Sequence, residues 1–310
     1  MTGNCTNNAP LAKFRFQKGK AHRLRLVNAG AAGQEVFSID GHELTVIAND
    51  YVGQRTDVVV QADGDASSAY WMRSNISTIC NLPRQPQALA EVLYDADTSK
   101  QPATQAWPYT DNGKCNNDDL SITTPYYSIT PAVNPAKTFQ VIVDEVVNAT
   151  GHLNWRLNEQ AFRGNYNKPL LLLAQEKDQT WVPEWNVVQP GDSRTPMHLH
   201  GHNMYILHEG DGFWDGQSIT NPQNPQRRDV QMLRPNGHIV AQYDADNPGV
   251  WPFHCHIAWH LSLGLYMNIL ERPDDVTSMS IPDILPQTCR DWDAYTSRAV
   301  VDQIDSGLKK

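Results

Sequence analysis

The sequence has no hydrophobic run long enough to cross a membrane. Its densest apolar stretch is 170–174, whereas a membrane helix needs about 20 apolar residues. The polar residues after Met1 give no signal-peptide pattern. Basic side chains are in the minority, with 25 Lys and Arg against 34 Asp and Glu, for a net charge of −9. These absences argue against membrane or nucleic acid as the main partner and favour a small substrate.

Long helical periodicity is also missing, and 282–295 is the best helix candidate. Short runs rich in Val, Ile, Leu and Tyr alternate instead with clusters of Gly, Pro, Asn and Asp, which is typical of strands and turns. The clearest runs are 22–27, 43–47, 56–61, 139–143, 204–207, 238–243 and 265–270. This pattern predicts an all-β chain built from β-sandwiches.

A length of 310 residues suggests two domains. The segment 96–126 has the weakest core-forming pattern, because it contains three prolines and the polar run 110–119. We therefore place a domain boundary near residue 122, which gives domains of 1–122 and 123–310.

The first chemical motif is the segment 251–260, which contains His254, Cys255, His256 and His260. Side chains alternate between the two faces of an extended chain. His254 and His256 should therefore point to one side and Cys255 to the other, and His260 can turn back towards Cys255. Because thiolate plus imidazole suits copper electron-transfer centres, one short strand could serve two metal sites.

This motif has two alternatives to a copper site. Unconnected core histidines with a structural cysteine would explain one isolated histidine, but not three histidines and a cysteine within seven positions. Structural zinc sites usually use paired Cys-x-x-Cys spacing, which is missing here.

The second motif is the segment 195–202, in which His198 and His200 share a face and Gly201 allows close backbone approach. Two His-x-His pairs far apart in sequence can converge on a cluster of copper ions. The alternative is a surface histidine cluster that binds metals adventitiously, and the presence of the first motif disfavours it.

Together these motifs resemble the C-terminal copper motifs of multicopper oxidases. The flanking segments 53–60, 224–229, 246–249 and 305–308 resemble those of ascomycete laccases. The resemblance covers nearly the whole chain. It implies two cupredoxin-like Greek-key β-sandwich domains, with a shortened second domain of the family at 1–122 and the C-terminal copper-binding domain at 123–310.

The resemblance assigns Cys255 and His260 to a type 1 copper, which takes electrons from substrate. Leu265 matches the axial position of that site, which does not bind the metal. The family supplies a third type 1 ligand, a histidine, where this sequence has Thr195. A neutral hydroxyl is a poor replacement for imidazole at copper, so this site is expected to be incomplete.

The resemblance assigns the other histidines to a trinuclear copper cluster. His198 matches a type 2 ligand, and His200, His254 and His256 match type 3 ligands. The family carries two more His-x-His motifs in an N-terminal domain, and none exists here. Only half a cluster is expected from these residues, and the missing domain is an expected partner. The other histidines are scattered singly and fit ordinary surface or core roles; they are His22, His42, His152, His208 and His238.

Two segments look shortened against the family, one between 52 and 53 and one between 188 and 195. By resemblance, Cys80 and Cys115 should form a disulfide. Cys289 matches a cysteine that pairs with the N-terminal domain, so it should be free here, and Cys5 has no assigned partner. The segment 305–308 resembles a C-terminal processing plug; an ordinary polar tail is the alternative.

The resemblance implies a secreted laccase-like oxidase that removes one electron from each phenolic substrate and reduces dioxygen to water. Three sequons, at Asn4, Asn75 and Asn148, agree with secretion. Thr195 and the missing domain should impair this activity. One alternative is a non-catalytic, copper-binding remnant or interaction module. Another, a two-domain oxidase that completes its cluster across subunits, would need further His-x-His motifs in this chain.

Overall fold

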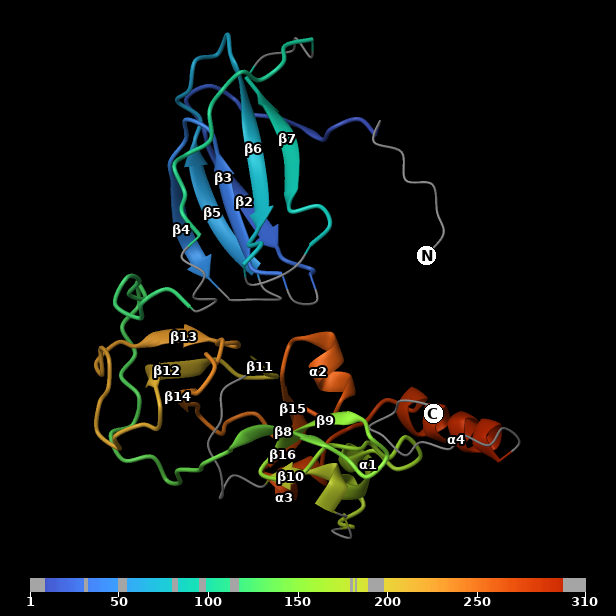
Figure 1. Cartoon of the computed structure of the whole chain (residues 1–310). Helices are drawn as coiled ribbons and strands as arrows, with labels where there is room; N and C mark the ends of the chain where they lie inside the picture. The colour runs from blue at the N-terminus through green and yellow to red at the C-terminus, as the bar shows by residue number, and fades with distance from the viewer. Residues whose placement is uncertain are drawn as a thin grey trace. The chain divides into compact units, whose positions relative to one another are not determined.

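Strands dominate the computed structural model, which describes residues 9–30, 33–49, 55–79, 83–94, 99–111, 117–178, 181, 183–188 and 198–297 (Figure 1). Sixteen strands and a few short helices occur in this part of the chain, so the prediction of an all-β chain is confirmed. Contacts divide the chain into two compact units, 1–115 and 116–310. Several residues discussed above lie outside the described residues, namely Asn4, Cys5, Cys80, Cys115, Thr195 and 305–308.

The first unit contains two sheets, ordered β1-β7-β6-β3 and β2-β5-β4. Its strands are β1 (Lys13–Arg15), β2 (Ala21–Val27), β3 (Glu35–Ile39), β4 (Leu44–Asn49), β5 (Arg55–Gln61), β6 (Ala69–Ile76) and β7 (Gln87–Leu93). Neighbouring strands are antiparallel, except that β1 runs parallel to β7.

Strand β2 shows why these segments form sheets. Its side chains alternate strictly between exposed and half-buried positions, as expected where one face is solvated. Arg23 and Arg25 lie on the exposed face and pair with Asp57 of β5, whereas Leu24 packs against the core. That core consists of Phe16, Ile39, Val60, Ala62, Tyr70, Met72 and Val92.

The second unit contains three sheets, ordered β10-β16-β15-β11, β13-β12-β14 and β8-β9. Its strands are β8 (Val143–Val147), β9 (Leu153–Leu157), β10 (Val187–Val188), β11 (His198–Leu199), β12 (Met204–Asp211), β13 (Gln226–Arg228), β14 (Gly237–Gln242), β15 (Gly249–His254) and β16 (Tyr266–Glu271). The helices are α1 (Leu170–Gln175), the 3-10 helix η1 (Pro183–Trp185), α2 (Ala258–Ser262), α3 (Pro273–Val276) and α4 (Ile284–Thr296).

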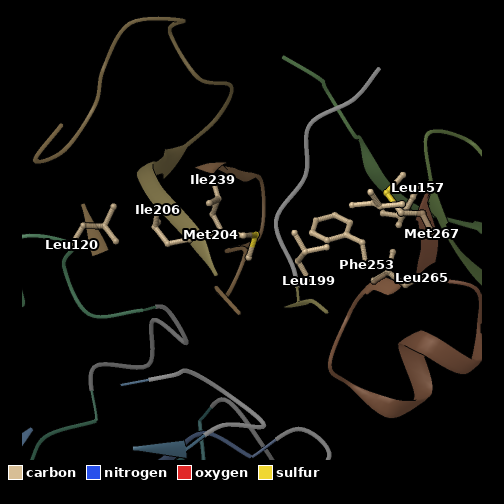
Figure 2. Packing of buried hydrophobic residues seen from close by; sticks show 10 residues of the cluster. Leu120, Leu157, Leu199, Met204, Ile206, Ile239, Phe253, Leu265 and Met267 are labelled. Atoms are coloured by element: carbon tan, nitrogen blue, oxygen red, sulfur yellow. The ribbon is translucent and has the colours of Figure 1, made fainter. Parts of the chain in front are cut away.

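One hydrophobic core joins the sheets of the second unit (Figure 2). In that view, Ile206 and Met204 of β12 lie with Leu120 and Ile239, and Phe253 lies with a second group of labelled residues. That second group is Leu157, Leu199, Leu265 and Met267. Because β11, β15 and β16 all contribute to this core, burial of apolar surface fixes the strands that carry the predicted metal ligands.

Two local predictions had different outcomes. The predicted helix at 282–295 is confirmed by α4 (Ile284–Thr296). The predicted strand at 139–143 is wrong, because β8 begins only at Val143. The backbone before it bonds instead to Asn158, which accepts from Ile142 N at 2.8 Å and donates its own N–H to Ile142 O at 2.9 Å. Asn158, a turn residue, thus makes the backbone hydrogen bonds that a neighbouring strand would otherwise make.

No helix in the described ranges is both long and apolar enough to cross a membrane.

Strand β9 offers a matched test of the core. Leu157 is fully buried, whereas Leu153 of the same strand is 41% exposed. We expect Leu157→Ala to lower the free energy of unfolding of the second unit by about 2–5 kcal/mol and Leu153→Ala to lower it by less than about 1 kcal/mol. Urea unfolding measures both changes, and equal losses in the two variants would contradict this packing.

Candidate metal centre

The register between β11 and β15 brings the two histidine motifs together. The strands are antiparallel, with His198 opposite His254 and Leu199 opposite Phe253. The pairing continues past β11, because His200 N donates to Pro252 O at 3.0 Å. Residues more than fifty positions apart in sequence therefore share one short ladder.

The same register places the core residues and the candidate metal ligands on opposite faces of the strand pair. Directly opposite residues of an antiparallel pair place their side chains on the same face. Leu199 and Phe253 both belong to the hydrophobic core, at 1% and 5% exposure. His198 and His254 consequently share the other face, so burial of one face presents histidines on the opposite one.

Three of these histidines form a compact cluster. The Nε2 atoms of His200 and His254 are 3.0 Å apart. One potential ligand atom from each of His198, His200 and His254 lies within 4.8 Å of the others. The His256 ring lies beside them, with its centroid 5.6 Å from that of His198 and 6.3 Å from that of His254. The structure thus brings together all four histidines that the sequence assigned to the cluster.

Backbone carbonyls orient two of the rings. His198 Nδ1 donates to Asp229 O at 3.0 Å, and His254 Nδ1 donates to Cys255 O at 2.8 Å. With the proton held on Nδ1, each ring leaves the lone pair of Nε2 available. Metal-binding histidines are commonly oriented in this way.

Burial keeps His254 and His200 of the cluster neutral. The pKa of His254 is lowered to about 4 by burial and by the neighbouring histidines together, against the raising effect of the bond to Cys255 O. Burial, followed by His198 and His256, also lowers the pKa of His200. Because a metal ion binds the deprotonated imidazole, these groups are ready for a metal at neutral pH.

These residues fit copper. The 3.0 Å separation between His200 Nε2 and His254 Nε2 is short enough for two metal–nitrogen bonds of about 2.0 Å to meet at one ion. Buried imidazoles are ligands that suit copper. The type, spacing and orientation of the ligands in the cluster therefore all fit copper, which is the metal that the sequence predicts.

A second pair of predicted ligands lies just past β15. Cys255 Sγ is 3.5 Å from His260 Nδ1, and His260 is carried by α2 (Ala258–Ser262). With metal–sulfur and metal–nitrogen bonds of about 2.3 and 2.0 Å, one ion could bridge these atoms at an angle of about 110°. Burial raises the pKa of the Cys255 thiol, so a bound metal would have to displace its proton.

Leu265 and Trp155 enclose this pair. Leu265 is 3% exposed and its carbonyl accepts from Cys255 N at 3.1 Å, which places its backbone beside the cysteine. The indole of Trp155 stacks on the His260 ring, with centroids 4.5 Å apart. No feature of the sequence connects Trp155 with this site, because only the chain's tertiary fold joins β9 to α2.

A buried acid–base pair supports the β11 turn. His202 Nε2 lies 3.0 Å from Glu271 Oε2, at ion-pair distance although without hydrogen-bond geometry, and the two side chains are 3% and 0% exposed. The other ring nitrogen of His202 donates to His200 O at 3.0 Å. Burial raises the pKa of Glu271. No sequence signal pointed to Glu271, which is the last residue of a hydrophobic strand.

Two histidines that are far apart in sequence meet in the fold, because His208 Nδ1 lies 2.9 Å from His238 Nε2.

Known families match both parts of the chain. Two sequence-family models, each described as multicopper oxidase, match residues 130–275 and 1–97. Both segments that hold the candidate copper ligands, 198–202 and 254–260, lie within the first match.

Curated fungal relatives match nearly all of the chain. Oxidoreductase OpS5 of Beauveria bassiana (strain ARSEF 2860) is 35% identical over 98% of this chain and 58% of its own length. Laccase-2 of Botryotinia fuckeliana is 31% identical with the same two coverages. This chain therefore spans less than two thirds of the length of these relatives.

Solved structures share the fold. The laccase from Botrytis aclada aligns with a TM-score of 0.82 at 27% identity, covering 99% of this chain and 63% of that one. Fet3p, described as a multicopper oxidase that functions in iron import, aligns with a TM-score of 0.75 at 23% identity, over 93% of this chain and 63% of its own. The latter similarity is one of fold alone.

The buried, neutral His254 predicts how the metal-free protein responds to acid. Its pKa is about 4 in the folded chain against an ordinary value of 6.5. Between these values the unfolded chain binds a proton that the folded chain does not, so stability falls with falling pH, by up to about 3 kcal/mol.

The His254→Gln variant should therefore lose about 3 kcal/mol less than wild type between about pH 7 and pH 4. Urea unfolding at a series of pH values measures this difference. His152→Gln, which changes a histidine outside the cluster, should keep the wild-type pH dependence. The same acid sensitivity in wild type and His254→Gln would count against a buried, neutral His254.

Proposed function

Because this chain belongs to the multicopper oxidase family, we propose that it supplies the substrate-oxidising site and half of the oxygen-reducing site of a laccase-like oxidase. One observation carries the proposal: the β11–β15 register places two His-x-His pairs side by side, with Cys255 between His254 and His256. Folds alone do not define function, and it is this ligand arrangement that favours oxidation.

The proposed reaction removes one electron and one proton from each of four phenol molecules and reduces one dioxygen molecule to two waters. Bound copper would supply the one-electron redox chemistry. The substrates are small phenols, as the resemblance to laccases implies, and the proposed location is extracellular.

The chain's own residues would form two sites, one that accepts electrons from substrate and one that reduces oxygen. Cys255 and His260 would hold the ion that accepts electrons, and Leu265 would shield it from water without binding it. His198, His200, His254 and His256 would hold ions at the oxygen site. Since Cys255 is bonded to both neighbouring histidines through the backbone, a short covalent path joins the two sites.

Trp155 governs access to the first site. Its indole covers one face of His260, so it separates that ligand from water on this side. Burial lowers the pKa of His260, and the charge of Glu145 partly opposes that effect. We propose that phenols approach His260 past this aromatic face.

Ligand count limits what these residues can do by themselves. Thr195 stands where the family has a type 1 histidine, and the sequence contains no further His-x-His motif to complete the cluster. We therefore propose that the 310 residues bind copper but oxidise phenols slowly or not at all. A copper-binding module without turnover is the second candidate function, and the same ligand count favours it.

Copper loading distinguishes these functions. After loading, visible absorption, electron paramagnetic resonance and oxygen uptake with a phenol should show bound copper, no intense thiolate-to-copper band and little turnover. An intense band together with oxygen uptake would show that the site is complete as it stands. Failure to bind copper would overturn both candidate functions.

Thr195→His should restore the third type 1 ligand. We expect the variant to gain an intense thiolate-to-copper absorption band without gaining oxygen uptake, because the cluster is still half complete. Thr195→Gln is the matched control, since it adds a polar side chain without an imidazole, and it should gain no band. A Thr195→His variant that stays colourless, or that keeps its colour when Cys255→Ser is added, would contradict the assignment.

A further inference from the structure

A second histidine pair lies on the ribbon formed by β12 and β14. These strands are antiparallel, with Gly210 opposite His238 and His208 opposite Val240, so the two histidines are diagonal neighbours. His208 Nδ1 and His238 Nε2 are 2.9 Å apart. The rings are nearly parallel, with an interplanar angle of 8° and centroids 5.1 Å apart. Both nitrogen atoms thus face one small volume.

The backbone fixes the orientation of His238. Its Nδ1 donates to Gly212 O at 2.9 Å, which leaves the lone pair of Nε2 directed towards His208. A Cβ on Gly210 would lie 2.9 Å from His238 Cε1, so a glycine at this position makes room for the ring. This combination of one nitrogen held by a carbonyl and one aimed at a partner is the usual arrangement of metal-binding imidazoles.

The surroundings favour a cation. Two carboxylates, Asp215 and Glu209, act electrostatically on His208 and favour positive charge there, and Glu209 is also paired with Arg234 at 3.1 Å. Asp215 stays ionised, because hydrogen bonds from Ser218 and Gln217 lower its pKa to about 2. The negative charge of Asp215 would therefore favour a cation at this pair.

We propose that His208 and His238 form a further site, separate from both candidate copper centres, for a divalent transition-metal ion, with Cu²⁺ as the preferred ion. With metal–nitrogen bonds of about 2.0 Å, nitrogens 2.9 Å apart subtend about 90° at the ion. That angle matches the square-planar or tetragonal geometry of Cu²⁺ better than the tetrahedral geometry of Zn²⁺. Binding would move the His208 proton from Nδ1 to Nε2, and water would fill the remaining positions.

This site is independent of the proposed oxidase function, because none of its residues belongs to either candidate copper centre. The competing explanation is a simple hydrogen bond, in which His208 Nδ1 donates to His238 Nε2 and no metal enters. The two explanations differ in the number of Cu²⁺ ions that the chain binds.

Equilibrium dialysis of the full chain against Cu²⁺, followed by elemental analysis, provides the test. We expect His208→Gln and His238→Gln each to bind one ion fewer than wild type. His152→Gln, which changes a histidine outside both sites, should bind as many ions as wild type. In a His254→Gln background, His208→Gln should still remove one ion, which separates this site from the main cluster.

Gly210→Ala sharpens the test, because it keeps both imidazoles and displaces only the His238 ring. We expect the Cu²⁺ affinity of this site to fall about tenfold or more. Repeating the dialysis with Zn²⁺ should show weaker binding at this site than Cu²⁺ shows. Unchanged Cu²⁺ stoichiometry in a folded His208→Gln or His238→Gln chain would overturn the proposal, as would wild-type affinity in Gly210→Ala.

Discussion

The pairing of β11 with β15 is the interaction on which the site depends. A two-residue strand, His198–Leu199, has little stability of its own, and its position is set by Leu199, which packs against Phe253 in the core. A register shift of one residue would turn the histidines into the core and the leucine out of it. Hydrophobic burial thus enforces the geometry of a polar site.

Burial also determines the chemistry of that site. The protein keeps His254 neutral by withdrawing it from water, and it holds the ring in place with a backbone carbonyl rather than a charged side chain. Burying a neutral His254 lowers the stability of the protein at acid pH. The same burial leaves a nitrogen lone pair available for copper. Behind the ligands, the buried pair of His202 and Glu271 supports the turn that carries His200.

Most strands were predictable because short runs of Val, Ile, Leu and Tyr between turn residues are a local feature of the sequence, and the helix at 282–295 was also found from the local sequence. The copper motifs were predictable because their ligands are close together in sequence. The contacts of Glu271 and Trp155 were not predictable, since each residue reaches the site only through the tertiary fold. The same holds for His208 and His238, which meet across a strand pair. The hydrophobic residues at 139–143 led to a wrong strand prediction. Asn158 makes the backbone hydrogen bonds there that a neighbouring strand would otherwise have made.

Anomalous diffraction at the copper absorption edge, from crystals of the copper-loaded chain, tests the central claim most directly. We predict a copper peak within bonding distance of His200 Nε2 and His254 Nε2, and a separate peak beside Cys255 Sγ and His260 Nδ1. Copper peaks elsewhere, with none at the histidines of β11 and β15, would contradict the account.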